Sequence, residues 1–405
     1  MRDQEKDTET KLYFQTLDDK TECVGVYTDG KLYFDSIPEG LSKTWRHSGI
    51  VQHSPAEYAW IYAQGKNLLE ICPPNLIDEL KANQAKFRAY LKSFRIAKIN
   101  LRELCFFDLV PDDFLLEFCD TKNKITKHVF ETFERPPNYQ HLSDVHRLLH
   151  KIKFNDLDID LKDCRNILVN TQDRNRVKSI VSGPTFIDYN LFGTATGRLT
   201  TFSHSLPILT MKKQLRQIIK PKNDWLLSLD YNGAEIRTVL ALSSEPQPDL
   251  DIHLWNAKNV FGGFVERNEA KEKFFAWLYN PESTIIENEL YDREKLLKEY
   301  YIDGKISTPF GRTIEVEERK ALNYLIQSTT ADIVLDRAVK LDEFLDDKRS
   351  FISHIVHDEI VIDLHNEDKN LVPLIKNIFE NNNLGRFRCN LNAGKNYYDL
   401  KDLNL

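Results

Sequence analysis

Two apolar segments that each stop at an acid place the strongest constraint on how this chain can fold. Residues 226–229 predict a buried strand that ends at Asp230, where a helical pattern begins. Residues 351–356 predict a second buried strand, which stops at Asp358 and Glu359 before an apolar pattern resumes. Either acid alone could serve as a helix cap or a turn residue. Taken together, they indicate two strands that bring carboxylates to one place.

Paired carboxylates at neighbouring strand ends carry a chemical requirement of their own. Two anions a few ångströms apart repel each other, and the pKa of one should rise unless cations lie between them. Hard divalent cations prefer oxygen ligands, and two Mg²⁺ ions about 3.5–4 Å apart can stabilise the attacking and leaving oxygens of a phosphoryl transfer. No cluster of His and Cys residues offers a competing zinc site. We therefore predict that Asp230 and Asp358 hold two Mg²⁺ ions.

Composition limits the classes of protein to which this chain can belong. Its 405 residues suffice for two or three domains, and 41% hydrophobic residues suffice for a proper core. No run of about 18 apolar residues predicts a membrane span, and the first residues lack the apolar core of a signal peptide. The six cysteines are scattered without a CxxC pair, which predicts a reducing cytosol and no disulfides.

The overall charge argues against a nucleic-acid partner, because the net charge is −7. Two local patches differ from that average. Residues 81–102 contain seven basic residues and no acidic one, and residues 211–222 form a second basic run. Each run is explained either by a solvated helix face or by contact with phosphates, whose condensed counterions Lys and Arg displace. The sequence leaves both explanations open.

The segment 266–280 predicts a helix with an ordered stripe along one face. Arg267, Lys271, Phe275 and Tyr279 recur every four residues. Each step therefore drifts by only about 40° around the axis and rises by about 6 Å. The stripe presents two cations and then two aromatic rings over roughly 18 Å, which matches the layout of a nucleoside triphosphate. An ordinary amphipathic helix with Phe275 in the core explains the same spacing.

A second helical stripe lies further along the chain. Arg319, Asn323 and Gln327 are again spaced by four, and Arg198 lies in a glycine-containing segment. Side chains of these types can hydrogen-bond to purine N3 and pyrimidine O2, which base pairs present in the minor groove. Such a stripe would test the shape of a base pair without reading its sequence. A solvent-facing helix surface is the ordinary alternative.

Six segments, met in the same order, resemble motifs of the family A DNA polymerases, the DNA polymerase I type. The resemblance covers about residues 176–364. Besides the stripe at 267–279, the matching segments are TATGRL (194–199), DYNGAEIR (230–237), DIHLWNAKNVFG (251–262), ERKALNYLIQSTTADI (318–333) and VHDEIV (356–361).

The resemblance implies a role for each of these side chains. Asp230, Asp358 and Glu359 would be the catalytic acids, and the first two would hold the metals. Glu235 would crowd the 2′ position of the incoming sugar and exclude ribonucleotides. The incoming dNTP would also contact His253, Arg267, Lys271, Phe275 and Tyr279, and the primer–template would contact Arg198, Arg319, Asn323, Gln327 and His357.

The fold that the resemblance implies is α+β, a right hand of palm, fingers and thumb with a small N-terminal α/β module. Helical patterns dominate residues 55–152 and also fill roughly 233–300 and 317–345. A TDG turn at 28–30 predicts a hairpin in the N-terminal module. The predicted domains are the N-terminal module (1–80), a helical basic thumb (81–175), a first palm segment (176–240), fingers (241–318) and a second palm segment (319–405).

The sequence departs from the family's motifs in three places. Asn232 and Gly233 stand where Ser and Gln are usual, and Asn280 follows Tyr279 where Gly is usual. Residues 202–213 do not carry the family's N-L-Q-N-I-P. These differences concern contacts around the primer–template and the helix end, and they leave the two metal acids in place.

The N-terminal region differs more strongly from the family. A proofreading exonuclease of this family needs a far longer region and several acids, among them a D-x-E at the end of a strand. DTET at 7–10 has that spelling, but no apolar strand precedes it. Residues 1–80 are therefore predicted to be a reduced exonuclease or a new module in its place.

We therefore predict a template-directed DNA polymerase that adds dNTPs to a primer 3′ end without intrinsic proofreading. One alternative is a single-subunit RNA polymerase, which Glu235 disfavours because that enzyme must accept the 2′-hydroxyl. Another is a degenerate relative that only binds primer–template, which the two retained acids disfavour. The predicted location is the cytoplasm of a bacterial or phage-infected cell, without a membrane partner. A separate exonuclease or replisome factors are further candidate partners.

Overall fold

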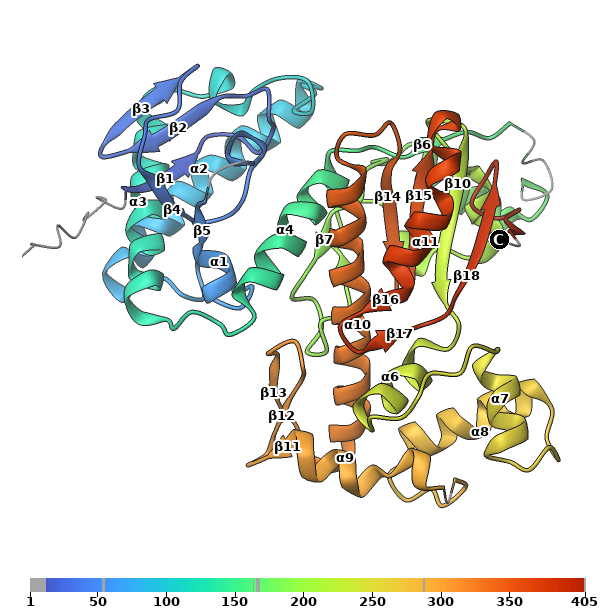
Figure 1. Ribbon diagram of the computed structural model, residues 1–405. Helices are drawn as coiled ribbons and strands as arrows, with labels where there is room; N and C mark the ends of the chain where they lie inside the picture. Colours follow the sequence, from blue (N-terminus) through green and yellow to red (C-terminus); the bar gives the residue numbers. More distant parts are fainter. Residues whose placement is uncertain (1–11, 53–54, 163, 165–167, 287, 404–405) are drawn as a thin grey trace, which may run out of the picture. The chain divides into compact units, whose positions relative to one another are not determined.

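The computed structural model describes residues 12–52, 55–162, 164, 168–286 and 288–403. The chain forms two compact units, Met1–Lys151 (unit 1) and Ile152–Leu405 (unit 2) (Figure 1). Helices and strands both contribute to each unit, so the fold is α+β, as predicted. Within the described ranges, no helix is both long enough and apolar enough to cross a membrane.

Unit 1 contains a five-stranded sheet. Its strands are β1 (Leu12–Thr16), β2 (Gly25–Thr28), β3 (Lys31–Phe34), β4 (Leu41–Thr44) and β5 (Glu57–Tyr58). The order across the sheet is β3-β2-β1-β4-β5, with β1 to β3 antiparallel and β4 parallel to both of its neighbours. The predicted hairpin is confirmed, because Asp29 and Gly30 join β2 to β3 with φ angles of 48° and 74°, the left-handed geometry that two-residue hairpin turns require.

The helices of unit 1 connect the basic run at residues 81–102 to this sheet by packing. They are α1 (Ala59–Tyr62), α2 (Ile77–Ile96), α3 (Asp112–Thr132) and α4 (Tyr139–Lys153), the last of which contains the boundary with unit 2. Helix α3 packs on the sheet and α2 packs on α3, where the rings of Phe87 and Phe118 stack 5.4 Å apart. The structure therefore divides the chain after Lys151, whereas the sequence suggested divisions at 80 and 175.

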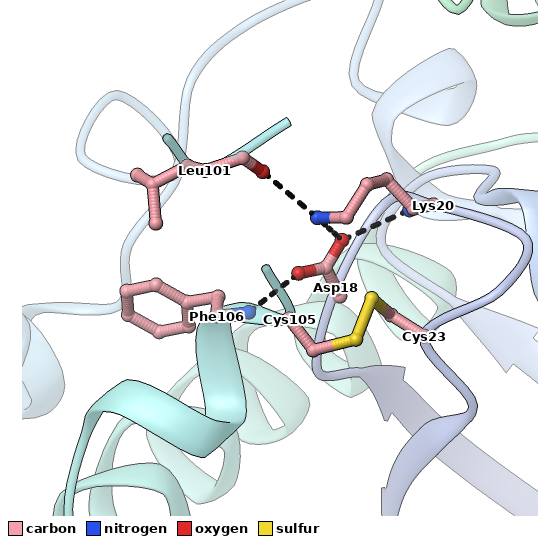
Figure 2. Close-up of a disulfide and its surroundings, with 6 residues drawn as sticks. All are labelled: Asp18, Lys20, Cys23, Leu101, Cys105 and Phe106. Carbon is pink, nitrogen blue, oxygen red and sulfur yellow. Dashed lines mark hydrogen bonds and ion pairs between the residues drawn. A yellow bond between two sulfur atoms is a disulfide. The ribbon is translucent and has the colours of Figure 1, made fainter. Parts of the chain in front are cut away.

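A disulfide joins Cys23 to Cys105 in unit 1, across 82 residues of sequence (Figure 2). The prediction of no disulfides is therefore wrong. Beside the bond, Lys20 and Asp18 form a buried ion pair at 2.7 Å, and the second Asp18 oxygen accepts a hydrogen bond from the Phe106 amide at 2.7 Å. Cysteine spacing gave no sign of this pair, because the contact depends on how two distant loops fold together.

Unit 2 is built on an antiparallel five-stranded sheet. Its strands are β10 (Trp225–Tyr231), β14 (Phe351–Val356), β15 (Glu359–Leu364), β18 (Cys389–Gly394) and β19 (Lys401–Asp402). The order is β14-β15-β10-β18-β19, so both of the acid-tipped segments from the sequence lie in one sheet. Helices α10 (Glu318–Leu345) and α11 (Val372–Glu380) pack against this sheet.

A helical region follows β10 in the chain and shares one core with the first half of α10. It contains α6 (Ala234–Leu242), α7 (Ile252–Asn259), α8 (Arg267–Tyr279), α9 (Arg293–Tyr300) and the small sheet β11 (Tyr301–Ile302), β12 (Lys305–Ser307) and β13 (Thr313–Glu315). Phe274 and Trp277 of α8 are buried in this core, whereas Phe275 is only half-buried at its edge. The assignment of these segments to palm and fingers remains a prediction.

Short elements complete the two units. The remaining helix is α5 (Thr171–Val181), and the remaining strands form the pairs β6 (Asp158–Ile159) with β9 (Ile219–Lys220), β7 (Tyr189–Asn190) with β8 (Thr200–Thr201), and β16 (Asn381–Asn382) with β17 (Gly385–Arg386). Short 3₁₀ helices lie at Gly49–Val51, Pro74–Leu76, Phe106–Leu109, Ile208–Thr210, Lys213–Ile218, Glu289–Tyr291 and Asn366–Leu371.

Candidate active site

The central strand of the unit 2 sheet brings the two predicted metal acids together. Asp230 lies near the end of β10, opposite Glu359 of β15 on one side and Asn390 of β18 on the other. Asp358 and His357 form the two-residue turn between β14 and β15, in which His357 has a φ of 58°. Because β10 and β15 are antiparallel neighbours, this turn lies beside the end of β10 that carries Asp230.

The electrostatics at this end of the sheet are those of an anionic site that is short of positive charge. Burial, followed by the charges of Asp358 and Glu359, raises the pKa of Asp230 to about 7. A hydrogen bond from the Asn390 side chain and the charge of Lys271 act in the opposite direction but do not outweigh those effects. A bound cation would favour the ionised form of Asp230.

The donor set fits a hard divalent cation that is only partly coordinated by protein. Among the described residues, no group of three or more His, Cys, Asp or Glu side chains is arranged to hold a metal. The carboxylates of Asp230 and Asp358 would therefore share any metal with water and substrate oxygens. Mg²⁺ is ordinarily bound in this way, through one or two carboxylates and the phosphates of a substrate.

A cavity of about 540 Å³ opens over the acids. One wall carries the stripe of α8, with its two cations nearer the start of the helix and its two aromatic rings nearer the end. The rings of Phe275 and Tyr279 are nearly parallel, with centroids 5.8 Å apart. Ten of the predicted side chains line this cavity: Arg198, Asp230, Glu235, His253, Arg267, Lys271, Phe275, Tyr279, His357 and Asp358.

Four predicted residues lie outside the lining. Glu359 directs its carboxylate along the sheet, where other side chains already donate hydrogen bonds to it. Arg319 is exposed and forms an ion pair at 2.7 Å with Glu317, at the start of α10. Gln327 hydrogen-bonds to the side chain of Tyr279, and Asn323 is half-buried one turn earlier on the same helix.

Glu235 lies in the first turn of α6 and is almost completely buried, with 8% of its surface exposed. Its carboxylate forms an ion pair with Arg198 and accepts a hydrogen bond from the Tyr279 hydroxyl at 3.1 Å. Burial raises the pKa of Glu235, while Arg198 and Tyr279 partly offset that rise. The side chain is therefore held in one position at the wall of the cavity.

Arg267 is oriented by a residue to which the sequence had assigned no role. The Asp251 carboxylate accepts hydrogen bonds from Arg267 Nε at 3.1 Å and Nη2 at 2.8 Å. Burial acts to raise the pKa of Asp251, but the hydrogen bonds from Arg267 and Asn232 hold it below its ordinary value. Asp251 also caps α7 through the amides of His253 and Leu254. An acid directly before a helical pattern is the signal that could have identified it.

His253 lies at the start of α7 with 4% of its surface exposed. Burial is the main cause that lowers its pKa to about 4, and the charges of Arg267 and Lys271 act in the same direction. The imidazole is therefore neutral near pH 7. Its Nδ1 atom is buried and makes no hydrogen bond within the described part of the chain.

Two departures from the family motifs have a local structural reason. Gly233 has a φ of 70°, and a Cβ atom there would lie 2.4 Å from the Ile252 side chain. Asn232 joins the same two segments, because its Oδ1 accepts a hydrogen bond from the Ile252 amide at 2.8 Å. Asn280 ends α8 with a φ of −108°, a conformation that does not require glycine.

Comparisons with known proteins bear on this geometry. Residues 288–399, which include Asp358, match the family model described as DNA polymerase family A. This part of the chain is therefore similar to the family A DNA polymerases. The chain is 27% identical over 262 residues to DNA polymerase I of Synechocystis sp., covering 48% of this chain and 27% of that protein. It is 29% identical over 245 residues to the thermostable DNA polymerase I of Thermus aquaticus, covering 47% of this chain and 29% of that protein.

A phage protein and a solved structure add to these relatives. The chain is 26% identical over 228 residues to the DNA polymerase of Mycobacterium phage D29, covering 43% of this chain and 37% of that protein. The matches thus span only about a quarter to a third of the bacterial relatives. The fold is similar to the POL domain of Pol1 from M. smegmatis, in complex with DNA primer-template and dNTP, with a TM-score of 0.68, 14% identity and 96% of each chain covered.

Proposed function

We propose that this chain is a family A DNA polymerase, which catalyses template-directed addition of dNTPs to a primer 3′ end with two Mg²⁺ ions. The observation that carries the proposal is that Asp230 and Asp358 line one cavity together with the two cations of α8. Two carboxylates with a deficit of positive charge suit metal ions, and the cations suit the phosphates that such ions bind. A nucleoside triphosphate needs both features within one site.

The metals would rest on Asp230 and Asp358. When bound, they would neutralise developing charge on the reacting phosphate and its two flanking oxygens. Lys271 and Arg267 would bind the triphosphate, and the ion pair with Asp251 holds the Arg267 guanidinium ready for that contact. The neutral imidazole of His253 can donate one hydrogen bond to a phosphate oxygen.

The sugar and base would lie further along α8. Glu235, held by Arg198 and Tyr279, would fill the space beneath C2′ and exclude a 2′-hydroxyl by steric conflict. Phe275 and Tyr279 would pack against the sugar and the base. The primer–template would contact the remaining predicted residues, Arg198, Arg319, Asn323, Gln327 and His357.

The alternatives from the sequence are less well supported. The position of Glu235 disfavours a polymerase that must accept ribonucleotides, and the retention of both metal acids disfavours a chain that only binds DNA. We also propose that unit 1 has no proofreading activity. Strand β1 has the sequence LYFQT without an acid, and the acids Asp7 and Glu9 lie outside the described residues. A purified sample should leave a mismatched primer unshortened in Mg²⁺ without dNTPs, and shortening that depends on Glu9 would refute this.

The setting of the reaction follows from its substrates. We place the protein in the cytoplasm of a bacterial or phage-infected cell, where primer–template and dNTPs occur together, and a separate exonuclease or replisome factors would then act beside it. The Cys23–Cys105 disulfide does not favour that compartment, since cytosolic disulfides are uncommon. Its redox state in freshly lysed producing cells, measured by thiol alkylation, would test the placement.

The proposed activity is tested by single-nucleotide primer extension with purified protein. We expect the nucleotide complementary to the template base to be added in Mg²⁺, and the other three dNTPs to be added much more slowly. Changing the template base should change the preferred dNTP. Absence of template-dependent addition in both Mg²⁺ and Mn²⁺ would refute the proposal.

A further inference from the structure

Glu359 lies directly opposite Asp230 in the sheet, yet its carboxylate is fully engaged elsewhere. Oε1 accepts a hydrogen bond from the Ser228 hydroxyl at 2.6 Å, and Oε2 accepts one from the Tyr397 hydroxyl at 2.6 Å. Both donors are buried, with 2% and 3% of their surfaces exposed. Ser228 precedes Asp230 by two residues on β10, so this contact draws the Glu359 carboxylate back along the strand.

Tyr397 is itself fixed at three points. Its amide donates to the Ile219 carbonyl at 3.1 Å, and its ring packs edge-on against His354 with centroids 4.6 Å apart. Arg216 donates to the Tyr397 hydroxyl oxygen at 3.1 Å and lies over the same ring. The same guanidinium lies 4.0 Å from the Glu359 carboxylate, so it also supplies positive charge to this group.

The arrangement matters because a third carboxylate would otherwise be able to enter the metal site. Residues directly opposite each other in an antiparallel pair have Cβ atoms about 5 Å apart. An unrestrained Glu359 side chain could therefore reach a cation bound by Asp230. Mg²⁺ that carries three protein carboxylates would be held more tightly, but one of its positions would no longer be open to water or substrate phosphate.

We infer that Tyr397 is a positioning residue, which together with Ser228 and Arg216 holds Glu359 away from the metals. Two carboxylates then set the coordination, and Glu359 is not in contact with the reacting atoms. This inference rests on the proposed two-metal function. It assigns a role to the loop between β18 and β19, which has no motif of its own in the sequence.

The test compares Tyr397→Phe with the matched control Tyr398→Phe, whose ring is 39% exposed. Two quantities are measured for each variant: kcat for single-nucleotide insertion, and the Mg²⁺ concentration that gives half of the metal-induced rise in Tm without DNA. Tyr397→Phe should lower kcat about tenfold or more, the range typical of groups that orient metal ligands. It should also lower the Mg²⁺ midpoint at least about threefold, as an added ligand predicts. Tyr398→Phe should match wild type in both measurements.

A double-mutant cycle separates positioning from general structural damage. In a Glu359→Gln background the released group is no longer an anion, so adding Tyr397→Phe should change neither quantity by more than about twofold. The inference would be overturned if Tyr397→Phe lowered kcat and the Mg²⁺ midpoint equally in both backgrounds. It would also be overturned if Tyr397→Phe alone kept the wild-type kcat and Mg²⁺ midpoint. If Tyr397→Phe does not fold, Ser228→Ala removes the other donor and must shift the Mg²⁺ midpoint in the same direction.

Failure of the proposed function would look different. A wild-type protein that adds no nucleotide, or that shows no rise in Tm with Mg²⁺, refutes the two-metal assignment itself. A wild-type protein that is active and stabilised by Mg²⁺, with Tyr397→Phe indistinguishable from it, refutes only the role of Tyr397.

Discussion

Asp230→Asn should stabilise the metal-free protein while it abolishes nucleotide addition. The carboxylate is held at the end of β10 by the fold, where burial and the charges of Asp358 and Glu359 oppose its ionisation. Asparagine is nearly the same size and carries no charge. The variant therefore removes the repulsion and keeps the packing, at the expense of a metal ligand.

The size of the effect follows from the pKa of Asp230, which rises from 3.8 to about 7. Each unit corresponds to about 1.36 kcal/mol, so the upper bound is about 4 kcal/mol, and solvent screening reduces it to about 2 kcal/mol. The folded state holds the proton more tightly than the unfolded state. The ionised carboxylate consequently costs nothing below about pH 4, costs more as the pH rises from about 4 to 7, and costs its full amount above that range.

Thermal unfolding at several pH values measures this prediction. For a unit of this size, about 2 kcal/mol corresponds to a rise in Tm of roughly 4–8 °C. Asp230→Asn should therefore gain several degrees over wild type at pH 8 and little at pH 4, and the exposed control Asp402→Asn should gain nothing at either pH. Saturating Mg²⁺ should raise the Tm of wild type but not of Asp230→Asn. An equal gain at both pH values, or none, would refute the electrostatic reasoning.

Three further predictions concern other parts of the molecule. Reduction of the Cys23–Cys105 disulfide, which closes a loop of 82 residues, should destabilise unit 1 by up to about 4–5 kcal/mol; an unfolding transition that is insensitive to dithiothreitol, or a Cys105→Ser variant as stable as the oxidised wild type, would contradict it. Glu235→Ala should greatly improve the insertion of ribonucleotides, and Phe275→Tyr should improve the insertion of dideoxynucleotides. Unchanged rNTP/dNTP and ddNTP/dNTP ratios of insertion efficiency would show that both side chains are merely structural. In unit 1, four exposed cations form a line of about 21 Å along α2 and pair with no described acid: Lys81, Arg88, Lys92 and Arg95. Their replacement by Ala should reduce the slope of log K against log salt for duplex DNA by as much as about 3.6, whereas an unchanged slope would show a solvated face.

The sequence was informative where a function depends on local spacing. The strand before Asp230, the hairpin around Asp358 and the four-residue repeat of α8 each follow from the period of one element, and the structure forms all three. The hairpin at Asp29 was also predictable, because its turn chemistry is contained in two residues. Such patterns need no knowledge of what packs against the element.

Contacts between distant segments were not predictable in this way. Glu359 follows Asp358 directly in the chain, and only the positions of Ser228 and Tyr397 show that its carboxylate is held elsewhere. Asn390 contacts Asp230 because two strands far apart in the sequence are neighbours in the sheet. The Cys23–Cys105 disulfide and the packing of α2 on α3 depend in the same way on the folded arrangement of unit 1.

The central claim is that Asp230 and Asp358 act as a metal-holding pair in nucleotide addition, and Asp358→Asn tests it most directly. Single-nucleotide insertion and the Kd for primer–template should be measured on the same preparation, beside wild type. We expect that insertion falls below detection while the Kd for DNA stays within about threefold of wild type, because the substitution removes a metal ligand and leaves every basic side chain in the cavity in place. Insertion by Asp358→Asn at a rate close to that of wild type would contradict the account.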